Sequence, residues 1–138
     1  MVFAIIDTGV YIDHLERGRV TGDLTVLGKQ FVVRHSAVVL SELRRGARTK
    51  EAIRLVELMR RNATVIWEPT VDDWWRAGEL VREIGDTQKW ETNKRREFQN
   101  DALIALTAVR HGASVVTRNR NDFTLLANAT GLRVVNLN

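Results

Sequence analysis

The chain has 138 residues, of which 44% are hydrophobic and 28% are charged, a composition that fits one folded domain over residues 1–138 and excludes a disordered or low-complexity chain. It contains no cysteine, which excludes disulfides, thiolate metal sites and cysteine nucleophiles. Lys and Arg outnumber Asp and Glu by 21 to 17, and the resulting net charge of +4 suits a phosphate-rich partner. No apolar run approaches the roughly 20 residues of a membrane span, so we expect a soluble, cytoplasmic protein without membrane contact.

The first third of the chain predicts two strands and a helix. Val2 to Ile6 is an apolar run too short for a helix and predicts a buried strand, and Phe31 to Val33 predicts a second one. Ser36 stands in N-cap position before a helix from Ala37 to Arg45, which Gly46 ends. This part of the chain therefore predicts a strand followed by a strand-then-helix unit.

The middle of the chain predicts two further helices. Thr49 to Arg61 has an amphipathic pattern with Thr49 as the cap, and Thr70 to Asp73 has the spacing of a capping box. The helix that starts there has an apolar stripe that includes Trp74 and Trp75, and Gly85 is its expected end. We therefore expect both tryptophans to lie in the core.

The last third of the chain predicts alternating helices and strands. Residues 86–97 lack periodicity and predict an exposed connection. They are followed by a helix at Phe98–His111, a strand at Ser114–Val116, a helix at Phe123–Thr130 and a strand at Arg133–Val135. Because strands joined by helical crossovers run parallel, the pattern predicts an α/β fold with a central parallel β-sheet flanked by α-helices on both faces.

Four acidic residues stand out by their positions relative to these elements. Asp7 follows the first strand directly, and Asp122 follows the strand at Ser114–Val116 after a short polar loop. Both therefore belong at the carboxyl edge of a parallel sheet, where such folds bind ligands. Asp101 lies in the first turn of the predicted helix that leads to that strand, which begins at the same edge. Glu42 lies beside the buried stripe of its own helix, so it is the fourth candidate.

Each acid also has a simpler explanation, because Asp7, Asp101 and Asp122 could each do no more than cap a turn or favour a helix N-terminus. Gathered in one cleft, however, carboxylates repel one another, and protonation or a bound cation relieves that repulsion. Oxygen ligands of this kind favour Mg²⁺ or Mn²⁺ over zinc. The three histidines lack metal-motif spacing, so we interpret them as structural or surface residues.

Four sequence blocks together resemble one known family. They are IIDTGVYID at residues 5–13, SELRRG at 41–46, NDALIALTAVRHG at 100–112 and VVTRNRNDF at 115–123. In their order and spacing these blocks are similar to the PIN-domain ribonucleases, specifically the VapC-like toxins of type II toxin–antitoxin modules, over nearly the whole chain. The resemblance implies a single PIN-like domain.

The resemblance also implies a reaction and a site. The reaction is that of a divalent-metal-dependent endoribonuclease, in which Mg²⁺ or Mn²⁺ activates a water that hydrolyses RNA phosphodiester bonds. Glu42 could bind a second ion or orient the attacking water, and Thr117 and Asn119 would position a phosphate or a carboxylate. The implied catalytic residues are Asp7, Glu42, Asp101, Asp122, Thr117 and Asn119, of which the four acids bind the metal.

Three partners follow from the same resemblance. They are an RNA substrate, a cognate antitoxin whose tail occupies the cleft, and a second copy of the chain in a homodimer. Inhibitors of this family can place an arginine against the acidic site, where a guanidinium takes the place of the charge of the metal.

Basic residues predict how RNA would be steered to an acidic centre. Residues 44–61 hold seven basic and two acidic residues, and a second basic group lies at 89–96 around Trp90, which could stack on an unpaired base. The simpler explanation is a solvated helix face and a charged loop that Trp90 pins to the body. The candidate RNA-binding residues are Arg44, Arg45, Lys89, Trp90, Lys94, Arg95 and Arg96.

Two other functions stay open on the sequence. One is a catalytically degenerate PIN-like module that binds RNA or an antitoxin without turnover, and the other is a metal-dependent phosphatase or DNA nuclease on a related frame. Covalent hydrolase chemistry is disfavoured, because the chain lacks cysteine, a G-x-S-x-G elbow and a G-x-x-x-x-G-K-[ST] loop.

Overall fold

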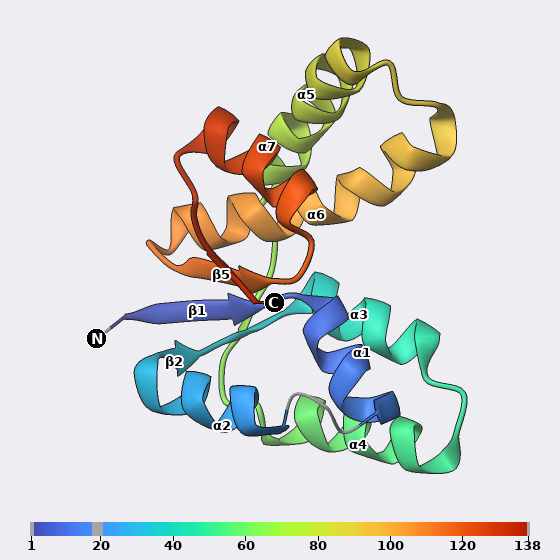
Figure 1. Cartoon of the computed structure of the whole chain (residues 1–138), viewed down its shortest axis with the longest axis vertical. Coiled ribbons are helices and arrows are strands. Elements are labelled where there is room, and N and C mark those ends of the chain that lie inside the picture. Colours follow the sequence, from blue (N-terminus) through green and yellow to red (C-terminus); the bar gives the residue numbers. More distant parts are fainter. Residues whose placement is uncertain (1, 18–20, 138) are drawn as a thin grey trace.

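A four-stranded sheet forms the centre of the computed structural model, which describes residues 2–17 and 21–137 (Figure 1). Its strand order is β2-β1-β5-β6, and every neighbouring pair is parallel. The predicted central parallel sheet is therefore confirmed. The strands are β1 (Phe3–Ile6), β2 (Val32–Val33), β5 (Ser114–Thr117) and β6 (Arg133–Asn136), and a separate parallel pair consists of β3 (His35–Ser36) and β4 (Ile66–Trp67).

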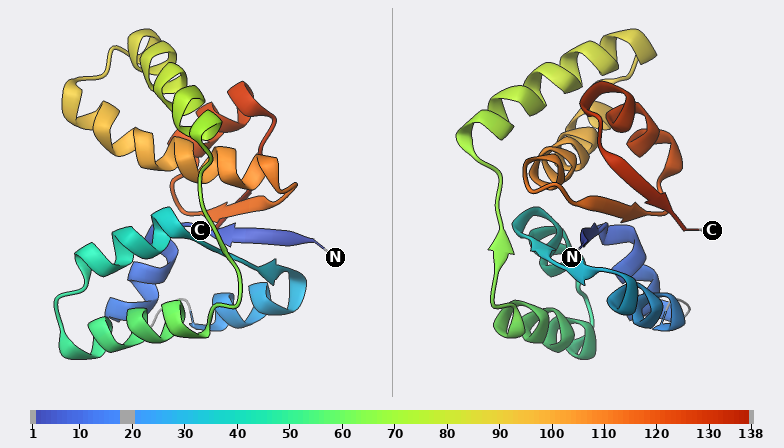
Figure 2. Two further views of the ribbon diagram at one scale, coloured as in Figure 1. Left: turned by 180° about the vertical axis from the view of Figure 1, so that it is seen from behind. Right: turned by 90° about the vertical axis from the view of Figure 1, so that its left-hand side faces the viewer.

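Helices lie on both faces of the sheet, as the sequence predicts (Figure 2). Strand β5 contacts α1 on one face and α6 on the other, and all four of its residues are buried. Such a doubly covered strand explains why its sequence is an unbroken β-branched run and does not alternate. The helices are α1 (Thr8–Arg17), α2 (Thr21–Gln30), α3 (Ala37–Gly46), α4 (Lys50–Asn62), α5 (Val71–Gln88), α6 (Thr92–Arg110) and α7 (Arg120–Thr130).

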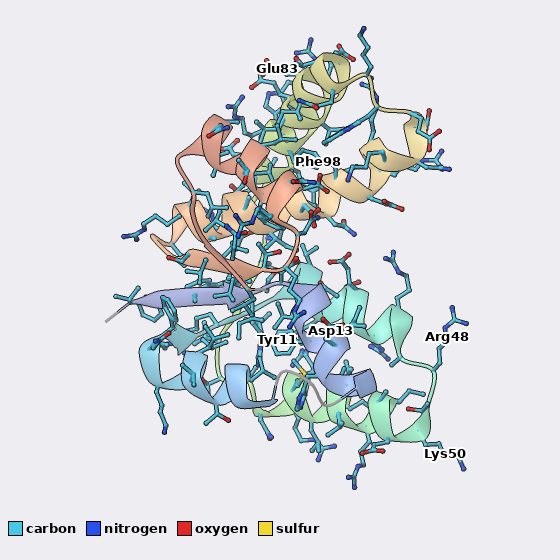
Figure 3. All side chains as sticks on the ribbon, viewed as in Figure 1. Tyr11, Asp13, Arg48, Lys50, Glu83 and Phe98 are labelled. Carbon is cyan, nitrogen blue, oxygen red and sulfur yellow. The ribbon has the colours of Figure 1, made fainter. Side chains whose placement is uncertain are left out.

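Among the described elements, helix α6 supplies the most buried hydrophobic residues of the core. Phe98, Leu103 and Ile104 are fully buried on it, and it packs against α5, α7 and strands β1 and β5. Figure 3 shows Phe98 on the side of α6 that faces α5. Within residues 2–17 and 21–137, no helix is both long and apolar enough to cross a membrane.

Three predicted helix starts are confirmed by their caps. The Ser36 hydroxyl accepts a hydrogen bond from the backbone N–H of Val38 at 3.1 Å, and Thr49 caps α4 in the same way. Thr70 and Asp73 form the reciprocal capping box, with each side chain accepting from the backbone N–H of the other. The polar side chains therefore satisfy backbone donors that the first turn of a helix leaves free.

The predicted burial of Trp74 and Trp75 is wrong. Trp74 is 51% exposed and Trp75 is 84% exposed. The inward positions of α5 are instead Asp73, Ala77 and Leu80, which repeat at helical spacing and are buried. Because the capping-box aspartate takes the inward position of the first turn, the two residues that follow it turn toward solvent.

Residues 86–97 are mostly exposed, as predicted, but the prediction that they form an irregular connection is wrong, because most of this segment is helical. Helix α5 runs through Gly85 to Gln88, where Lys89 adopts a left-handed conformation (φ 58°), and α6 begins at Thr92. Only residues 89–91 connect the two helices. Since helix α6 begins six residues before Phe98, Asp101 lies in the middle of it and not in its first turn.

Tertiary contacts hold the short connection between α5 and α6. Trp90 packs edge-on against Phe98 with ring centroids 4.7 Å apart. Arg95 donates hydrogen bonds to the backbone carbonyl of Trp90 at 2.9 Å and to the Asp86 carboxylate at 2.8 Å. Atoms of the Arg95 guanidinium lie 2.9–3.2 Å from where a Cβ of Gly85 would stand. Gly85 therefore makes room for this arginine and does not end the helix.

Two helices follow β1 where the sequence predicted no element. Helix α1 begins at Thr8, directly after Asp7, and α2 follows it. The Thr8-Gly9 pair therefore forms the start of a helix and not a loop.

Candidate active site

Asp7 is held at the carboxyl end of β1 by two hydrogen bonds. Its Oδ1 accepts from the backbone N–H of Thr8 at 2.9 Å, and its Oδ2 accepts from the hydroxyl of Thr117 at 2.8 Å. The side chain is buried, and this burial raises the pKa of Asp7, while the two hydrogen bonds oppose the shift. Asp7 and the last residue of β5 therefore meet at one edge of the sheet.

Glu42 reaches the same region from α3. Its Oε1 accepts a hydrogen bond from the Thr8 hydroxyl at 2.8 Å, and its Oε2 accepts from the side-chain amide of Asn100 at 3.5 Å. Thr8 thereby touches two acids, Asp7 through its backbone and Glu42 through its side chain. Neither Thr8 nor Asn100 was predicted as a site residue, although each stands next to a predicted acid in the sequence.

Asp122 lies in the first turn of α7, where Asn119 is the N-cap. Its Oδ2 accepts from the side-chain amide of Asn119 at 3.0 Å and from the ammonium of Lys94 at 2.6 Å. The backbone N–H of Asn119 donates to the Thr117 hydroxyl at 2.9 Å, and that hydroxyl donates to Asp7. A continuous run of hydrogen bonds therefore connects Asp7 with Asp122 through the two predicted supporting residues.

Asp101 lies close enough to the other three acids for their negative charges to change its pKa. Burial, followed by the charges of Asp7, Glu42 and Asp122, raises the pKa of Asp101 to about 8, and Lys94 opposes the shift. Because Asp101 is in mid-helix, the alternative that it only stabilises a helix N-terminus is excluded. Figure 1 shows α6 running past the carboxyl ends of β1 and β5, which brings the middle of this helix to the edge of the sheet.

A sequence model of the PIN domain family matches residues 4–128. The chain belongs to the PIN domain family. No curated protein matches the chain.

Solved structures similar to this PIN domain cover nearly its whole length. One is VapBC2 from Rickettsia felis bound to a promoter DNA fragment, 22% identical over 99% of this chain and 100% of that chain, with a TM-score of 0.72. Another is VapBC-1 from nontypeable Haemophilus influenzae, 19% identical over 98% of each chain, with a TM-score of 0.70. A third is DNA-bound VapBC from Salmonella typhimurium, 18% identical over 99% of this chain and 98% of that chain, with a TM-score of 0.67. At 18–22% identity these likenesses show a shared fold.

The four acids of this PIN domain offer the right chemistry for a hard divalent ion, since all their donors are oxygen. Burial, and then repulsion by three neighbouring acids, raises the pKa of Asp101, and a bound cation relieves repulsion of this kind. In the part of the chain that the structure describes, no group of three His, Asp or Glu side chains is arranged to hold an ion as it stands. Hydrogen bonds from Thr8, Thr117 and Lys94 orient the carboxylates of Glu42, Asp7 and Asp122.

The candidate RNA-binding residues of this PIN domain lie in two parts of the fold, the end of α3 and the region where α5 meets α6. Lys94 contacts Asp122, whereas Trp90 and Arg95 hold the connection between α5 and α6. Arg44 lines a groove of about 660 Å³ between α3 and α4, together with Arg60 and Arg61. Arg45, Lys89 and Arg96 are exposed, as are Arg48 and Lys50, which Figure 3 shows at the ends of α3 and α4.

Proposed function

We propose that this PIN domain is a divalent-metal-dependent endoribonuclease and the toxin of a toxin–antitoxin pair. One observation carries the proposal. Carboxylates from four separate segments neighbour one another at the carboxyl edge of a parallel sheet, and Asp7 is connected to Glu42 through Thr8 and to Asp122 through Thr117 and Asn119. Family membership supports nuclease chemistry, and the VapBC structures that share the fold support the toxin role.

Asp7, Asp101 and Asp122 would hold Mg²⁺ or Mn²⁺, which when bound supplies an activated water and offsets charge on the phosphate. The contribution of the chain is to fix these carboxylates. Thr117 sets the rotamer of Asp7, and Asn119 holds Asp122 while it caps α7. Glu42, fixed by Thr8, would bind a second ion or orient the attacking water.

Sequencing of RNA ends after controlled expression of the wild type and of Asp7→Asn tests activity and substrate together. New ends that appear only with the wild type support the proposal. Purified protein should cleave single-stranded RNA with added Mg²⁺, and a chelator should abolish the cleavage. Binding of RNA without cleavage would favour the degenerate module, while preferred cleavage of DNA or of a small phosphoester would favour the other enzymes.

We also propose an RNA contact through the basic residues and two protein partners, a cognate antitoxin and a second copy of the chain. For RNA, log affinity should fall linearly with log salt concentration as neutralised phosphates release counterions, and a flat response would exclude the basic residues as phosphate contacts. Light scattering of the purified chain tests the homodimer. Co-purification with the product of a neighbouring gene tests the antitoxin.

A further inference from the structure

The side chain of Lys94 reaches one of the four acids from a different helix. Lys94 lies in the first turn of α6, and its ammonium is 2.6 Å from Oδ2 of Asp122 in the first turn of α7. The Asp122 side chain is 9% exposed and the Lys94 side chain 33% exposed. The ion pair is therefore partly shielded from water, where a charge contact is stronger than on an open surface.

The path of this lysine is fixed by its neighbours. The Lys94 ammonium lies 5.0 Å from the centroid of the Trp90 ring, and Trp90 itself packs against the fully buried Phe98. The next residue, Arg95, binds the backbone carbonyl of Trp90. Because the aromatic ring and the backbone are both held, the lysine is directed toward Asp122.

Lys94 also shares a helix face with a second acid. It precedes Asp101 by seven residues, which is about two turns of α6, so both side chains point to the same side of the helix. The positive charge of Lys94 favours the ionised form of Asp101 and opposes the upward shift of its pKa. One ammonium therefore acts on two of the acids that the proposed function assigns to the metal.

An ammonium and a divalent ion that approach the same carboxylates repel each other and compete for the same oxygens. We propose that Lys94 is a built-in counter-cation of the four acids, which contacts Asp122 and leaves that oxygen when a divalent ion binds. This inference rests on the proposed function, because it concerns the same acids. The displaced ammonium would lie beside the site, where it can pair with a phosphate of the substrate.

The direct test is the affinity of the purified full chain for Mn²⁺, measured by titration calorimetry without RNA. Lys94→Met should bind Mn²⁺ at least about fivefold more tightly than the wild type, since one competing charge is removed. Lys94→Arg keeps the charge and should stay close to the wild type. Arg96→Met is the matched control, because it removes an exposed positive charge from the same turn of α6, and its affinity should change less than about twofold.

A second measurement uses the wild type and does not depend on a variant that folds. Saturating Mg²⁺ should speed the reaction of Lys94 with an amine-reactive reagent, because its ammonium is released from the contact with Asp122 and becomes accessible. Mass spectrometry measures the labelling rate of Lys94 relative to that of the exposed Lys89.

The outcomes separate the inference from the proposed function. Equal or weaker Mn²⁺ affinity in Lys94→Met, or slower labelling of Lys94 in Mg²⁺, would overturn the counter-cation role alone. No Mn²⁺ binding by any of the four proteins would overturn the metal-dependent function and this role with it.

Discussion

The hydroxyl of Thr117 donates a hydrogen bond to Oδ2 of Asp7 at 2.8 Å and so joins the carboxyl ends of β5 and β1. Both residues are buried, and 110 positions separate them in the sequence. The contact satisfies both groups, because the Thr117 hydroxyl orients the Asp7 carboxylate and the carboxylate accepts from a buried hydroxyl.

Asp7→Asn should reduce Mg²⁺-dependent RNA cleavage by at least about a hundredfold, because an amide is a far weaker ligand than a carboxylate for a hard cation. The fold should persist, since the amide oxygen can still accept from Thr8 or Thr117. Cleavage rate and circular dichroism measure the two effects. Asp72→Asn, an exposed acid at the start of α5, is the control. An undiminished rate in Asp7→Asn would exclude Asp7 from the reaction.

Thr117→Val should lower the cleavage rate by about 10- to 100-fold, because Asp7 loses the donor that orients it. Thr117→Ser keeps the hydroxyl and should recover most of the rate. The control is Thr107→Val, since Thr107 is a buried threonine that bonds the backbone carbonyl of Leu103 within α6. Both valine variants should lose about 1–3 kcal/mol of unfolding free energy. Equal rates for the two valine variants would contradict a positioning role of Thr117.

Asp101→Asn should raise the thermal midpoint of the protein in a chelator near pH 8, because the charged carboxyl is disfavoured by burial and by three neighbouring acids. Added Mg²⁺ should raise the midpoint of the wild type more than that of the variant, since the ion binds only the folded state. Thermal unfolding followed by circular dichroism gives both comparisons. A variant that is less stable than the wild type in chelator would show that the repulsion at Asp101 is negligible.

His35 should make the fold sensitive to acid. Burial lowers the pKa of this imidazole, and its Nδ1 has no hydrogen-bond partner among the described residues. The unfolded chain therefore binds a proton more readily than the folded chain, so stability should fall as the pH drops below about 6.5. In His35→Phe, urea unfolding between pH 7 and pH 5 should show a smaller loss than in the wild type. His14→Gln is the control for removing a different histidine. If His35→Phe and the wild type lost the same stability between pH 7 and pH 5, His35 would not be the cause of the acid sensitivity.

Trp75→Ser should change the unfolding free energy by less than about 0.5 kcal/mol, because the indole is 84% exposed. Leu80→Ala on the same helix should cost about 2–5 kcal/mol, since Leu80 is almost fully buried. Urea unfolding of the two variants compares them directly. A large loss of unfolding free energy in Trp75→Ser would contradict the exposed position of this tryptophan.

Local sequence patterns predicted the four strands of the central sheet and the caps of three helices, but not the separate pair β3 and β4. They therefore also predicted the surroundings of two of the acids. Asp7 follows an apolar run too short for a helix, and the polar loop before Asp122 contains the N-cap Asn119. Ser36 and Thr70 likewise predicted the starts of α3 and α5, and both helices contact α6. These patterns are local, because a short apolar run or an N-cap involves only a few consecutive residues and the backbone N–H groups of the next turn.

What local patterns could not predict depends on contacts between distant residues. The first turn of α6 has no apolar periodicity of its own, and its residues are held by Trp90 against Phe98 and by Arg95 against Asp86. The contact of Lys94 with Asp122 crosses 28 positions, so composition alone suggested only a generally basic segment. Which residues of α5 are buried depends on the side of the helix that α6 covers. The apolar pattern of the sequence therefore did not show that Ala77 is buried while Trp74 is half exposed.

Gly85 lets the connection between α5 and α6 close around Arg95. An alanine there would meet the Arg95 guanidinium at 2.9–3.2 Å, and the guanidinium, which is the far end of a flexible side chain, would have to move aside. The hydrogen bonds of Arg95 to the Trp90 carbonyl and to Asp86 would then have to form in another geometry. A single added methyl group at position 85 therefore bears on the short turn that leads into Lys94.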